Sequence, residues 1–370
     1  MRAAVVRETA GPFGLEELET PRPGTGEVLV KVAGCGVCHS DLHVRSGGIP
    51  FPMPCVLGHE VSGEVVDVGA DAGEFALGDR IVGAFIMPCR ACRFCRAGRE
   101  ELCERFFADN RLNGTLYDGR TRLFRPGGEP IAMYSMGGLA EYSVMPVGGI
   151  AKLPDELPLT ESAVLGCAFL TACGAVRNVG QPVLGESVAV IGAGGVGLAL
   201  VQVLAATGCA SITVIDISEE KLAGARLLGA HHTVQATSTD AVAVVREITG
   251  GRGVDLAFEV VGSPQTFRQA TELVADGGRC CFVGLAAAGI EGAVEINRLV
   301  RRRITLIGSF GGQPGRDLPT AVALAASGRI NLADAVSETF PLDQVDVAYA
   351  ALERGEILGR AVIDMNDRRN

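Results

Sequence analysis

The sequence predicts an α/β protein in which a doubly wound parallel sheet is joined to a β-rich domain. Three observations support this prediction. A glycine-rich turn at 192–197 joins a buried strand to an apolar helix, and further strand and helix patterns follow it. Strand-like segments recur through residues 1 to about 70, and two cysteine motifs lie among and after them. The chain of 370 residues is long enough for two domains that each bury a core.

The β-rich part begins at the N-terminus. Apolar and β-branched residues predict strands at 3–6, 27–32 and 61–68, with prolines and glycines between them. The segment Gly78–Gly83 is typical of a turn that enters one more strand. Together these segments predict an antiparallel, barrel-like module.

The first cysteine motif is the segment 38–43, Cys-His-Ser-Asp-Leu-His, which two distant residues complement. His59 follows Cys38 by 21 residues, and Cys167 lies in an apolar run much later. Two thiolates and one imidazole are the ligand set of a zinc site with three protein ligands. Because the fourth position of such a site stays open, we expect it to polarise a bound water or alcohol.

The second motif places four cysteines in a C-x2-C-x2-C-x7-C pattern: Cys89, Cys92, Cys95 and Cys103. Four thiolates at this spacing predict a closed tetrahedral zinc lobe, and the arginines between them offset part of its negative charge. An iron–sulfur cluster and a nucleic-acid-binding zinc ribbon use similar spacing and stay open as alternatives. A site with four cysteines leaves no position for a substrate, so we expect its role to be structural.

Six cysteines remain outside these motifs: Cys35, Cys55, Cys173, Cys209, Cys280 and Cys281. Free cysteine is commonly buried as a small hydrophobic residue, so we expect no disulfide framework. Between the motifs, residues 104–138 are rich in turn dipeptides, and we expect a long surface excursion with a functional or interfacial role.

The glycine-rich turn is the strongest cofactor signal. It runs Gly192, Ala193, Gly194, Gly195, Val196, Gly197, directly after the strand 186–191 and before an apolar helix. The first glycine permits a tight turn, the next lets the backbone approach a pyrophosphate, and Gly197 lets the helix pack closely. A helix N-terminus also attracts phosphate.

Asp216 ends the next strand, 24 positions after Gly192. Its carboxylate can accept hydrogen bonds from the adenosine ribose and would repel a 2′-phosphate, so the sequence favours NAD over NADP. Strand patterns at 254–261, 279–284 and 304–308 continue the parallel sheet. After about residue 312 the pattern ends, and we expect residues 331–370 to return to the first domain.

Composition limits the partners. The net charge of −10 argues against nucleic acid and anionic membranes, because an acidic surface repels both. The N-terminus has no apolar signal segment, and no apolar run near 18 residues is evident. We therefore expect a soluble, cytoplasmic enzyme that acts on a small molecule.

With these motifs in this order, the whole chain resembles the zinc-dependent medium-chain alcohol dehydrogenases. The resemblance implies a GroES-like, β-rich catalytic domain at 1–168 and 312–370 that carries the structural zinc lobe. It implies an NAD-binding Rossmann domain at 169–311. Two zinc ions per chain would follow, one catalytic and one structural.

The resemblance also implies roles at the first motif. Cys38, His59 and Cys167 would bind the catalytic zinc, and Glu60 would be a carboxylate that approaches the metal. Asp41 would hydrogen-bond His59 and fix its tautomer. Ser40 would receive the substrate proton and pass it through the nicotinamide ribose to His43 at the surface.

Four further residues resemble cofactor contacts. His39 stands where many relatives carry an arginine against the pyrophosphate, and Arg360 resembles the second such arginine. Lys221 resembles a lysine near the adenosine ribose, and Thr171 a residue beside the nicotinamide.

The implied substrate pocket contains Ile49, Phe85 and Tyr134, which favours an apolar alcohol. Because Ser40 replaces a bulkier threonine, aromatic, branched or secondary alcohols are expected. A glutathione-dependent formaldehyde dehydrogenase is an alternative, disfavoured by the apolar segment 49–54, and a polyol or sugar dehydrogenase is another. A non-catalytic protein that binds NAD and zinc is the third. The retained segment 104–138 resembles the dimeric branch of the family, so a homodimer is expected, with a tetramer as the alternative.

Overall fold

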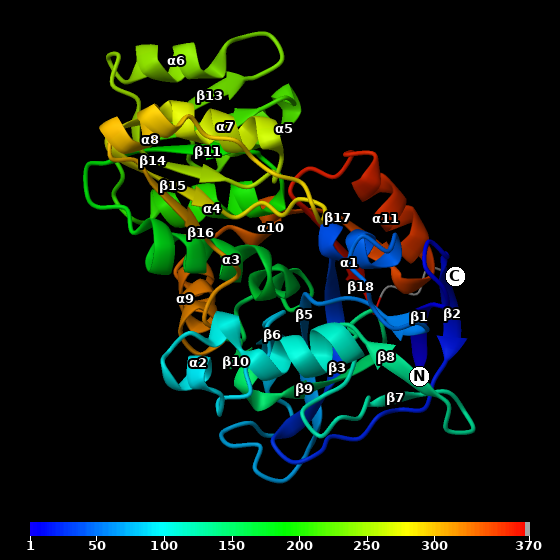
Figure 1. Cartoon of the computed structure of the whole chain (residues 1–370). Helices are drawn as coiled ribbons and strands as arrows, with labels where there is room; N and C mark the ends of the chain where they lie inside the picture. The colour runs from blue at the N-terminus through cyan, green and yellow to red at the C-terminus, as the bar shows by residue number, and fades with distance from the viewer. Residues whose placement is uncertain (367–370) are drawn as a thin grey trace. The chain divides into compact units, whose positions relative to one another are not determined.

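The structure is a computed structural model that describes residues 1–366. The chain divides into two compact units. Unit 1 contains residues 1–170, 313–328 and the chain from 336 onward, and unit 2 contains residues 171–312 and 329–335. Figure 1 shows the elements of both units. Residues 367–370 of the predicted catalytic domain lie outside the described residues.

Unit 2 is built on a six-stranded sheet in the order β13-β12-β11-β14-β15-β16. All its neighbouring strands pair in parallel. The order reverses direction after β11, which is the arrangement of a doubly wound nucleotide-binding fold. Its strands are β11 (Ser187–Ile191), β12 (Ser211–Asp216), β13 (His232–Gln235), β14 (Val254–Glu259), β15 (Val274–Phe282) and β16 (Thr305–Gly308).

Helices connect these strands, and three of them begin at a residue whose side chain caps the helix N-terminus. Ser218, Asp240 and Ser263 each cap a helix by accepting a backbone N–H with the side-chain oxygen. Because parallel strands need right-handed crossovers, helices before and after the reversal cover opposite faces. The connecting helices are α4 (Gly195–Ala205), α5 (Glu219–Leu227), α6 (Ala241–Ile248), α7 (Pro264–Leu273) and α8 (Ile296–Arg301). The short helix α10 (Leu332–Ala335) also belongs to unit 2.

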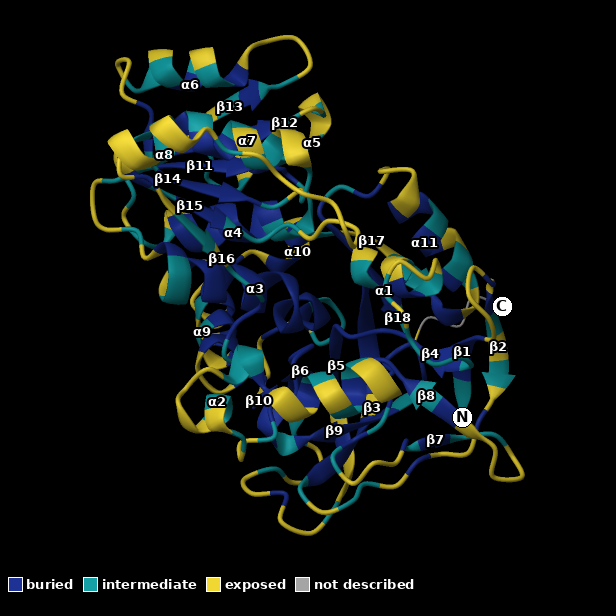
Figure 2. Ribbon diagram, in the orientation of Figure 1, coloured by how far each residue is buried: buried dark blue, intermediate teal, exposed yellow. Residues whose placement is uncertain are grey.

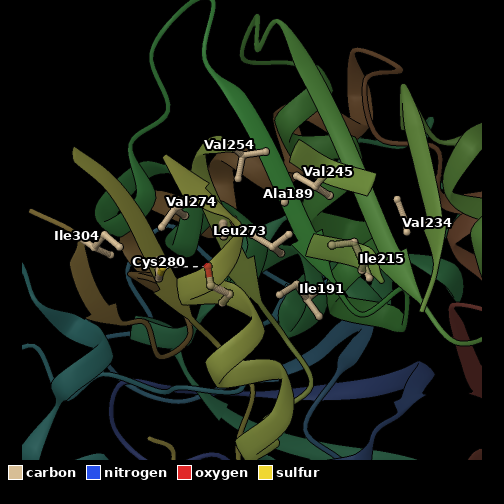
Figure 3. Packing of buried hydrophobic residues seen from close by; sticks show 13 residues of the cluster. Ala189, Ile191, Ile215, Val234, Val245, Val254, Leu273, Val274, Cys280 and Ile304 are labelled. Atoms are coloured by element: carbon tan, nitrogen blue, oxygen red, sulfur yellow. Dashed lines mark hydrogen bonds between the residues drawn. The ribbon is translucent and has the colours of Figure 1, made fainter. Parts of the chain in front are cut away.

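One core of unit 2 lies between the sheet and helices α6 and α7. Ile191, Ile215 and Val245 are almost completely buried there (Figure 3). Cys280 belongs to the same cluster, and its thiol donates to the carbonyl of Ala270 at 3.4 Å. The strands of the sheet are largely buried, whereas the outer faces of the helices are exposed (Figure 2). A buried parallel sheet explains the near-continuous apolar runs in these strands.

Unit 1 contains two sheets. The smaller has the order β2 (Phe13–Glu17), β1 (Arg2–Val6), β4 (Cys55–Val56), β8 (Pro130–Met133), β7 (Leu123–Phe124). The larger has the order β10 (Ile150–Lys152), β6 (Arg80–Gly83), β5 (Val61–Val68), β3 (Glu27–Val37), β18 (Arg360–Asp364), β17 (Val336–Pro341), and β9 (Tyr142–Pro146) also pairs with β3. The predicted fold class, an α/β chain with a GroES-like domain and a parallel sheet, is confirmed.

Short helices complete unit 1. They are α1 (His39–Arg45), α2 (Arg93–Arg96), η1 (Glu100–Leu102), η2 (Phe106–Arg111), η3 (Val147–Gly149), η4 (Glu161–Gly166), α9 (Pro314–Ala326), η6 (Leu342–Gln344) and α11 (Val345–Glu353). The helix α3 (Ala168–Gly174) and the π-helical turn η5 (Ala175–Gly180) continue η4 into unit 2. The continuous stretch Glu161–Gly180 is long and apolar enough to cross a membrane by composition, but it is mostly buried inside the protein. The prediction that no such run exists is therefore wrong at this stretch, whose burial is that of a core helix.

Two other segments differ from expectation. Residues 104–138 do not form a purely surface excursion, because Phe106, Leu116 and Ile131 are buried and β7 and β8 join the smaller sheet. The segment 329–335 groups with unit 2 instead of unit 1. Its Ile330 and Leu332 are buried, and the backbone N–H of Asn331 donates to Gln202 Oε1 at 2.7 Å.

Candidate functional site

The residues of the first motif converge in unit 1. Ligand-type atoms of Cys38, His59, Glu60 and Cys167 all lie within 4.8 Å of one another, and all four residues are buried. Cys38 follows β3, His59 and Glu60 precede β5, and Cys167 follows η4. The antiparallel pairing of β3 with β5 brings the first two segments together, and η4 packs against this pair. We call these four residues the Cys38 cluster.

A hydrogen bond links the two thiols of the cluster. A hydrogen bond from the Cys167 thiol lowers the pKa of Cys38 well below its ordinary value. The same hydrogen bond, together with burial, raises the pKa of Cys167. Because a buried thiolate is costly without a compensating cation, this donor set fits a divalent metal ion that prefers sulfur and nitrogen, such as Zn²⁺.

Asp41 holds the imidazole of His59. Its Oδ1 lies 3.1 Å from His59 Nδ1 and accepts the backbone N–H of Gly58 at 3.1 Å. Its Oδ2 accepts the hydroxyl of Tyr349 at 2.8 Å. Burial lowers the pKa of His59, but the charges of Asp41 and Cys38 outweigh it and raise that pKa to about 10. The Asp41–His59 contact is the one that the resemblance implies.

Glu60 and Arg360 form an ion pair at the cluster. Arg360 Nη2 lies 3.4 Å from Glu60 Oε1, and both side chains are buried. Burial raises the pKa of Glu60 to about 7, while Arg360 opposes that rise. A Cβ at Gly36 would lie 2.3 Å from Glu60 Oε2, so the glycine is what leaves room for this carboxylate. Arg360 Nε has no hydrogen-bond partner among the described residues.

Helix α1 presents the other polar residues of the motif. Ser40 Oγ lies 3.8 Å from Cys38 Sγ, so its hydroxyl is at the edge of the cluster. His43 stands one turn further along the helix and is exposed, as is His39 at its start. Residues three apart share a helix face, so Ser40 and His43 lie on the same side of α1.

Two aromatic rings lie near His59. The ring centres of Phe85 and Tyr134 lie 6.1 and 5.8 Å from the imidazole centre, and both rings meet it edge-on. Phe51 meets Tyr134 edge-on at 5.2 Å. Phe85 and Tyr134 are buried, whereas Ile49 is half-buried. Burial raises the pKa of Tyr134 and Arg111 lowers it.

The four cysteines of the second motif also lie together. The sulfur atoms of Cys89, Cys92, Cys95 and Cys103 all lie within 4.8 Å of one another. Backbone N–H groups of Cys89 and Phe106 donate to the Cys103 sulfur at 3.2 and 3.4 Å. Burial raises the pKa of Cys103, and these two donors oppose that rise. We call these four residues the Cys89 cluster. Two of the nearby arginines form ion pairs with acidic side chains. Arg93 pairs with Glu104, and Arg99 pairs with Glu101.

The glycine-rich turn of unit 2 has the geometry that its sequence predicts. Gly192 has a φ of 103°, which favours glycine. A Cβ at Gly197 would lie 1.9 Å from the carbonyl oxygen of Gly192, so α4 could not pack as closely with any larger residue. No atom outside the turn lies within 4 Å of a Cβ built at Gly194, which leaves that backbone open. Gly195 and Val196 begin α4 with no side-chain cap, so their N–H groups can meet a phosphate.

Asp216 lies beside this turn at the end of β12. Its Oδ2 accepts the N–H of Ala193 at 2.6 Å, and Oδ1 accepts the N–H of Ser218 at 2.9 Å. Lys221 is half-buried near the start of α5, and Thr171 is buried in α3. These positions fit a dinucleotide fold.

Comparison with known proteins gives the family. Residues 24–155 match the family described as alcohol dehydrogenase GroES-like domain, and residues 195–327 match the zinc-binding dehydrogenase family. The S-(hydroxymethyl)glutathione dehydrogenase of Synechocystis is 35% identical over 368 residues, an alignment that covers 98% of this chain and 99% of that protein. The chain belongs to the zinc-dependent medium-chain alcohol dehydrogenase family. The prediction of an NAD-dependent zinc alcohol dehydrogenase is confirmed at the level of this family.

Solved structures of related proteins are similar to this chain over nearly its whole length. An alcohol dehydrogenase zinc-binding domain protein from Burkholderia ambifaria superposes with a TM-score of 0.93 at 34% identity, covering 99% of each chain. The benzyl alcohol dehydrogenase of Acinetobacter calcoaceticus superposes with a TM-score of 0.92 at 30% identity, covering 98% of each chain.

Sequence reasoning missed three residues around the site of this alcohol dehydrogenase. Tyr349, the hydroxyl partner of Asp41, stands 308 positions further along the chain. Phe51 and Arg111 contact Tyr134, and no motif surrounds either of them. Tertiary packing alone brings Tyr349 to Asp41 and the other two side chains to Tyr134.

Proposed function

We propose that this protein oxidises apolar alcohols to aldehydes or ketones with NAD, and reduces those products in reverse. One observation carries the proposal. Two thiols, an imidazole and a carboxylate converge within 4.8 Å in the Cys38 cluster, with the Ser40 hydroxyl at its edge. Three of these groups suffice for a zinc site with an open position, and the hydroxyl can relay a proton by releasing its own as it accepts another.

In this proposal Cys38, His59 and Cys167 hold the catalytic zinc. When bound, zinc acts as a Lewis acid that lowers the pKa of the alcohol, and NAD accepts the hydride from its carbon. Ser40 would accept the alcohol proton while it releases its own hydroxyl proton to the nicotinamide ribose, and His43, exposed one turn along α1, would take the proton from the ribose and pass it to solvent. Asp41 occupies His59 Nδ1 and so leaves Nε2 as the ligand nitrogen.

Glu60 has a charge-balancing role in this scheme. Its ion pair with Arg360 places a cation and an anion beside two thiols, so the carboxylate is held within reach of the metal position. The unpartnered Arg360 Nε supports a second role for this residue as a pyrophosphate contact. His39 is exposed at the start of α1, which is compatible with the weaker pyrophosphate contact proposed for it.

For the cofactor we propose NAD over NADP. The support is the Asp216 carboxylate at the end of β12, beside the open turn at Gly194 and the uncapped N-terminus of α4. An added 2′-phosphate would meet this negative charge. Lys221 would contact the adenosine ribose and Thr171 the nicotinamide. Affinities for NADH and NADPH test this proposal, and tighter binding of NADPH would refute the role of Asp216.

For the Cys89 cluster we propose a structural zinc, which gives two zinc ions per chain. The compact arrangement of four sulfurs and their backbone N–H donors support it. Elemental analysis of purified protein is expected to return two zinc equivalents. An iron–sulfur cluster would instead give iron, acid-labile sulfide and a brown colour.

For the substrate we propose an aromatic, branched or secondary alcohol. The rings of Phe85 and Tyr134 against His59, and Ile49 further out, support an apolar body on the alcohol. The similarity to S-(hydroxymethyl)glutathione dehydrogenase makes the formaldehyde–glutathione adduct the second candidate.

A panel of benzyl alcohol, cyclohexanol, sorbitol and formaldehyde with glutathione, assayed with NAD, separates these alternatives. We expect the highest kcat/KM for benzyl alcohol. If zinc-loaded protein turns over none of these alcohols, the proposal is wrong and a non-catalytic protein that binds NAD and zinc is favoured. A preference for sorbitol would indicate a polyol dehydrogenase.

We also propose the catalytic domain at 1–168 and 312–370, the cofactor domain at 169–311, a cytoplasmic location and a homodimer. Support for the domains comes from the two compact units, apart from the segment 329–335. Support for the homodimer comes from the segment 104–138, which resembles the dimeric branch. Light scattering distinguishes the dimer from the tetramer.

A further inference from the structure

Three arginines gather at one end of unit 2. Arg246 lies in the last turn of α6, Arg298 lies on α8, and Arg302 caps the C-terminus of α8 (Figure 1). Because Arg298 and Arg302 are four residues apart, their side chains share one face of that helix. We call these three residues the Arg298 cluster.

Two of these guanidinium groups meet at the C-terminus of α7. Arg298 donates through Nε to the carbonyl of Thr271 at 2.9 Å and through Nη2 to the carbonyl of Glu272 at 2.8 Å. Arg246 Nη2 donates to the same Glu272 carbonyl at 3.4 Å. Because Arg298 already satisfies both carbonyls with shorter bonds, the end of α7 does not require the second arginine.

The positive charge of the cluster exceeds the negative charge that the chain places against it. Within residues 1–366, only Arg302 of the three forms an ion pair, and its partner is Asp276. Glu272, at the end of α7, pairs instead with Arg268 at 2.8 Å. The C-termini of α6 and α7 each add about half a unit of negative charge. Three guanidinium groups therefore face one paired carboxylate and two helix ends.

The arginines of the cluster repel one another. Burial lowers the pKa of Arg298, and the charges of Arg302 and Arg246 lower it further. Glu272 and Glu295 oppose this change without reversing it. Like charges held together in a partly desolvated place cost free energy, and a bound anion would remove that cost. In a chain whose net charge is −10, this excess of positive charge is local.

Each arginine of the cluster keeps hydrogen-bond donors for a ligand. In the part of the chain that the structure describes, Arg298 uses Nε and Nη2, Arg246 uses Nη2, and Arg302 uses Nε. All three side chains are half-buried, so a ligand can reach them while water screens them less than at an open surface. A carboxylate is satisfied by the two parallel bonds of a single guanidinium, whereas the oxygens of a phosphate can accept from several. Three converging guanidinium groups therefore favour phosphate.

We propose that the Arg298 cluster binds a phosphate dianion, either free or as the end group of a phosphate monoester. The cluster lies where α7 ends and β15 begins, at the amino end of that strand. The glycine-rich turn follows the carboxyl end of β11, and parallel strands place these ends at opposite edges of the sheet. The phosphate site is therefore separate from the dinucleotide position, and it does not depend on the proposed function.

The test titrates inorganic phosphate into zinc-loaded protein saturated with NADH, in a calorimeter and at an ionic strength held constant with sodium chloride. NADH occupies the glycine-rich turn, so phosphate cannot bind there. The wild-type protein is expected to bind one equivalent. Arg246→Gln should weaken the phosphate affinity by about tenfold, the effect of one charge-assisted hydrogen bond, and should leave the NADH affinity unchanged. This variant keeps the two bonds from Arg298 that cap α7.

Two variants serve as controls. Arg246→Lys keeps the positive charge and should lose less phosphate affinity than Arg246→Gln. Arg226→Gln makes the same change elsewhere in unit 2, at an arginine that already pairs with Glu219 at 2.8 Å, and should bind phosphate like the wild type. Methyl phosphate in place of inorganic phosphate distinguishes the two sources, because an ester site binds it at least as tightly and a site for the free ion binds it more weakly.

Urea unfolding gives a second readout that does not depend on the variant being as stable as the wild type. A ligand that binds the folded state raises its stability, so phosphate should raise the wild-type midpoint and raise that of Arg246→Gln less. No saturable binding of either phosphate compound by the wild type would overturn the inference. Equal phosphate affinity in wild type and Arg246→Gln, or an equal rise of both midpoints, would overturn it as well.

Discussion

The substitution Tyr349→Phe tests how the hydrogen bond from Tyr349 to Asp41 supports His59 of the Cys38 cluster. It removes one hydroxyl and keeps the ring, which is completely buried and stacks on Phe13 at 4.8 Å. No cavity of side-chain size forms, so the packing energy stays. What is lost is a 2.8 Å hydrogen bond to Asp41, a buried residue that also positions His59.

The expected cost follows from that bond alone. A hydrogen bond to a charged group contributes roughly 1.5–3 kcal/mol, and the buried Asp41 oxygen would gain no water in exchange. We therefore expect unit 1 to lose about 2 kcal/mol. Since Asp41 orients His59, we also expect the affinity for the catalytic zinc to fall by roughly tenfold or more.

Two measurements check these numbers. Hydrogen exchange of amides in β5, next to His59, reports the opening of unit 1 separately from unit 2, and about 2 kcal/mol corresponds to roughly thirtyfold faster exchange. Competition with a chelator reports the zinc affinity. Tyr142→Phe is the matched control, because this tyrosine is half-buried and its hydroxyl has no hydrogen bond within the described residues. If the β5 amides of Tyr349→Phe exchange at the wild-type rate and its zinc affinity equals that of the wild type, the reasoning is wrong.

Three further predictions test other parts of the molecule. Gly197→Ala would place a Cβ 1.9 Å from the carbonyl of Gly192, so we expect weaker NADH binding and a less stable unit 2. Gly224→Ala, in α5 with no atom within 4 Å of the added Cβ, should instead stabilise by about 0.5–1 kcal/mol, and urea unfolding with NADH titration compares the two. Arg279 donates to Glu186 at 2.6 and 3.0 Å and lowers the pKa of that carboxyl below its ordinary 4.5. The pair therefore stabilises above pH 4.5 and loses its contribution as the pH falls through the lowered pKa, so Arg279→Met should cost about 1 kcal/mol at pH 7 and progressively less in acid; a cost that grows in acid would contradict this sign. Cys167→Ala should abolish turnover while the fold remains, and Cys103→Ala should lower the unfolding midpoint with the loss of one zinc equivalent; a fully active Cys167→Ala enzyme would refute the ligand assignment.

Elements that depend on local interactions could be predicted from the chain alone. The turn at 192–197 needs glycines at fixed positions, and Gly192 and Gly197 prove to be the two that backbone geometry requires. The cysteine spacing in 89–103 likewise closes within a single segment. Strand patterns in unit 2 were readable because buried parallel strands are apolar along their whole length.

Features that depend on contacts between distant segments could not be predicted in this way. The pairing of Asp41 with Tyr349, the ion pair of Glu60 with Arg360, and the place of Arg111 above Tyr134 leave no periodic or local signal in the chain. The same holds for 104–138, where two short strands lie among turns and become regular only because β8 pairs with β4 and β7 pairs with β8. The spacing of residues along the chain can predict a site whose residues are neighbours in sequence. The residues that surround and support such a site come together only when the core packs.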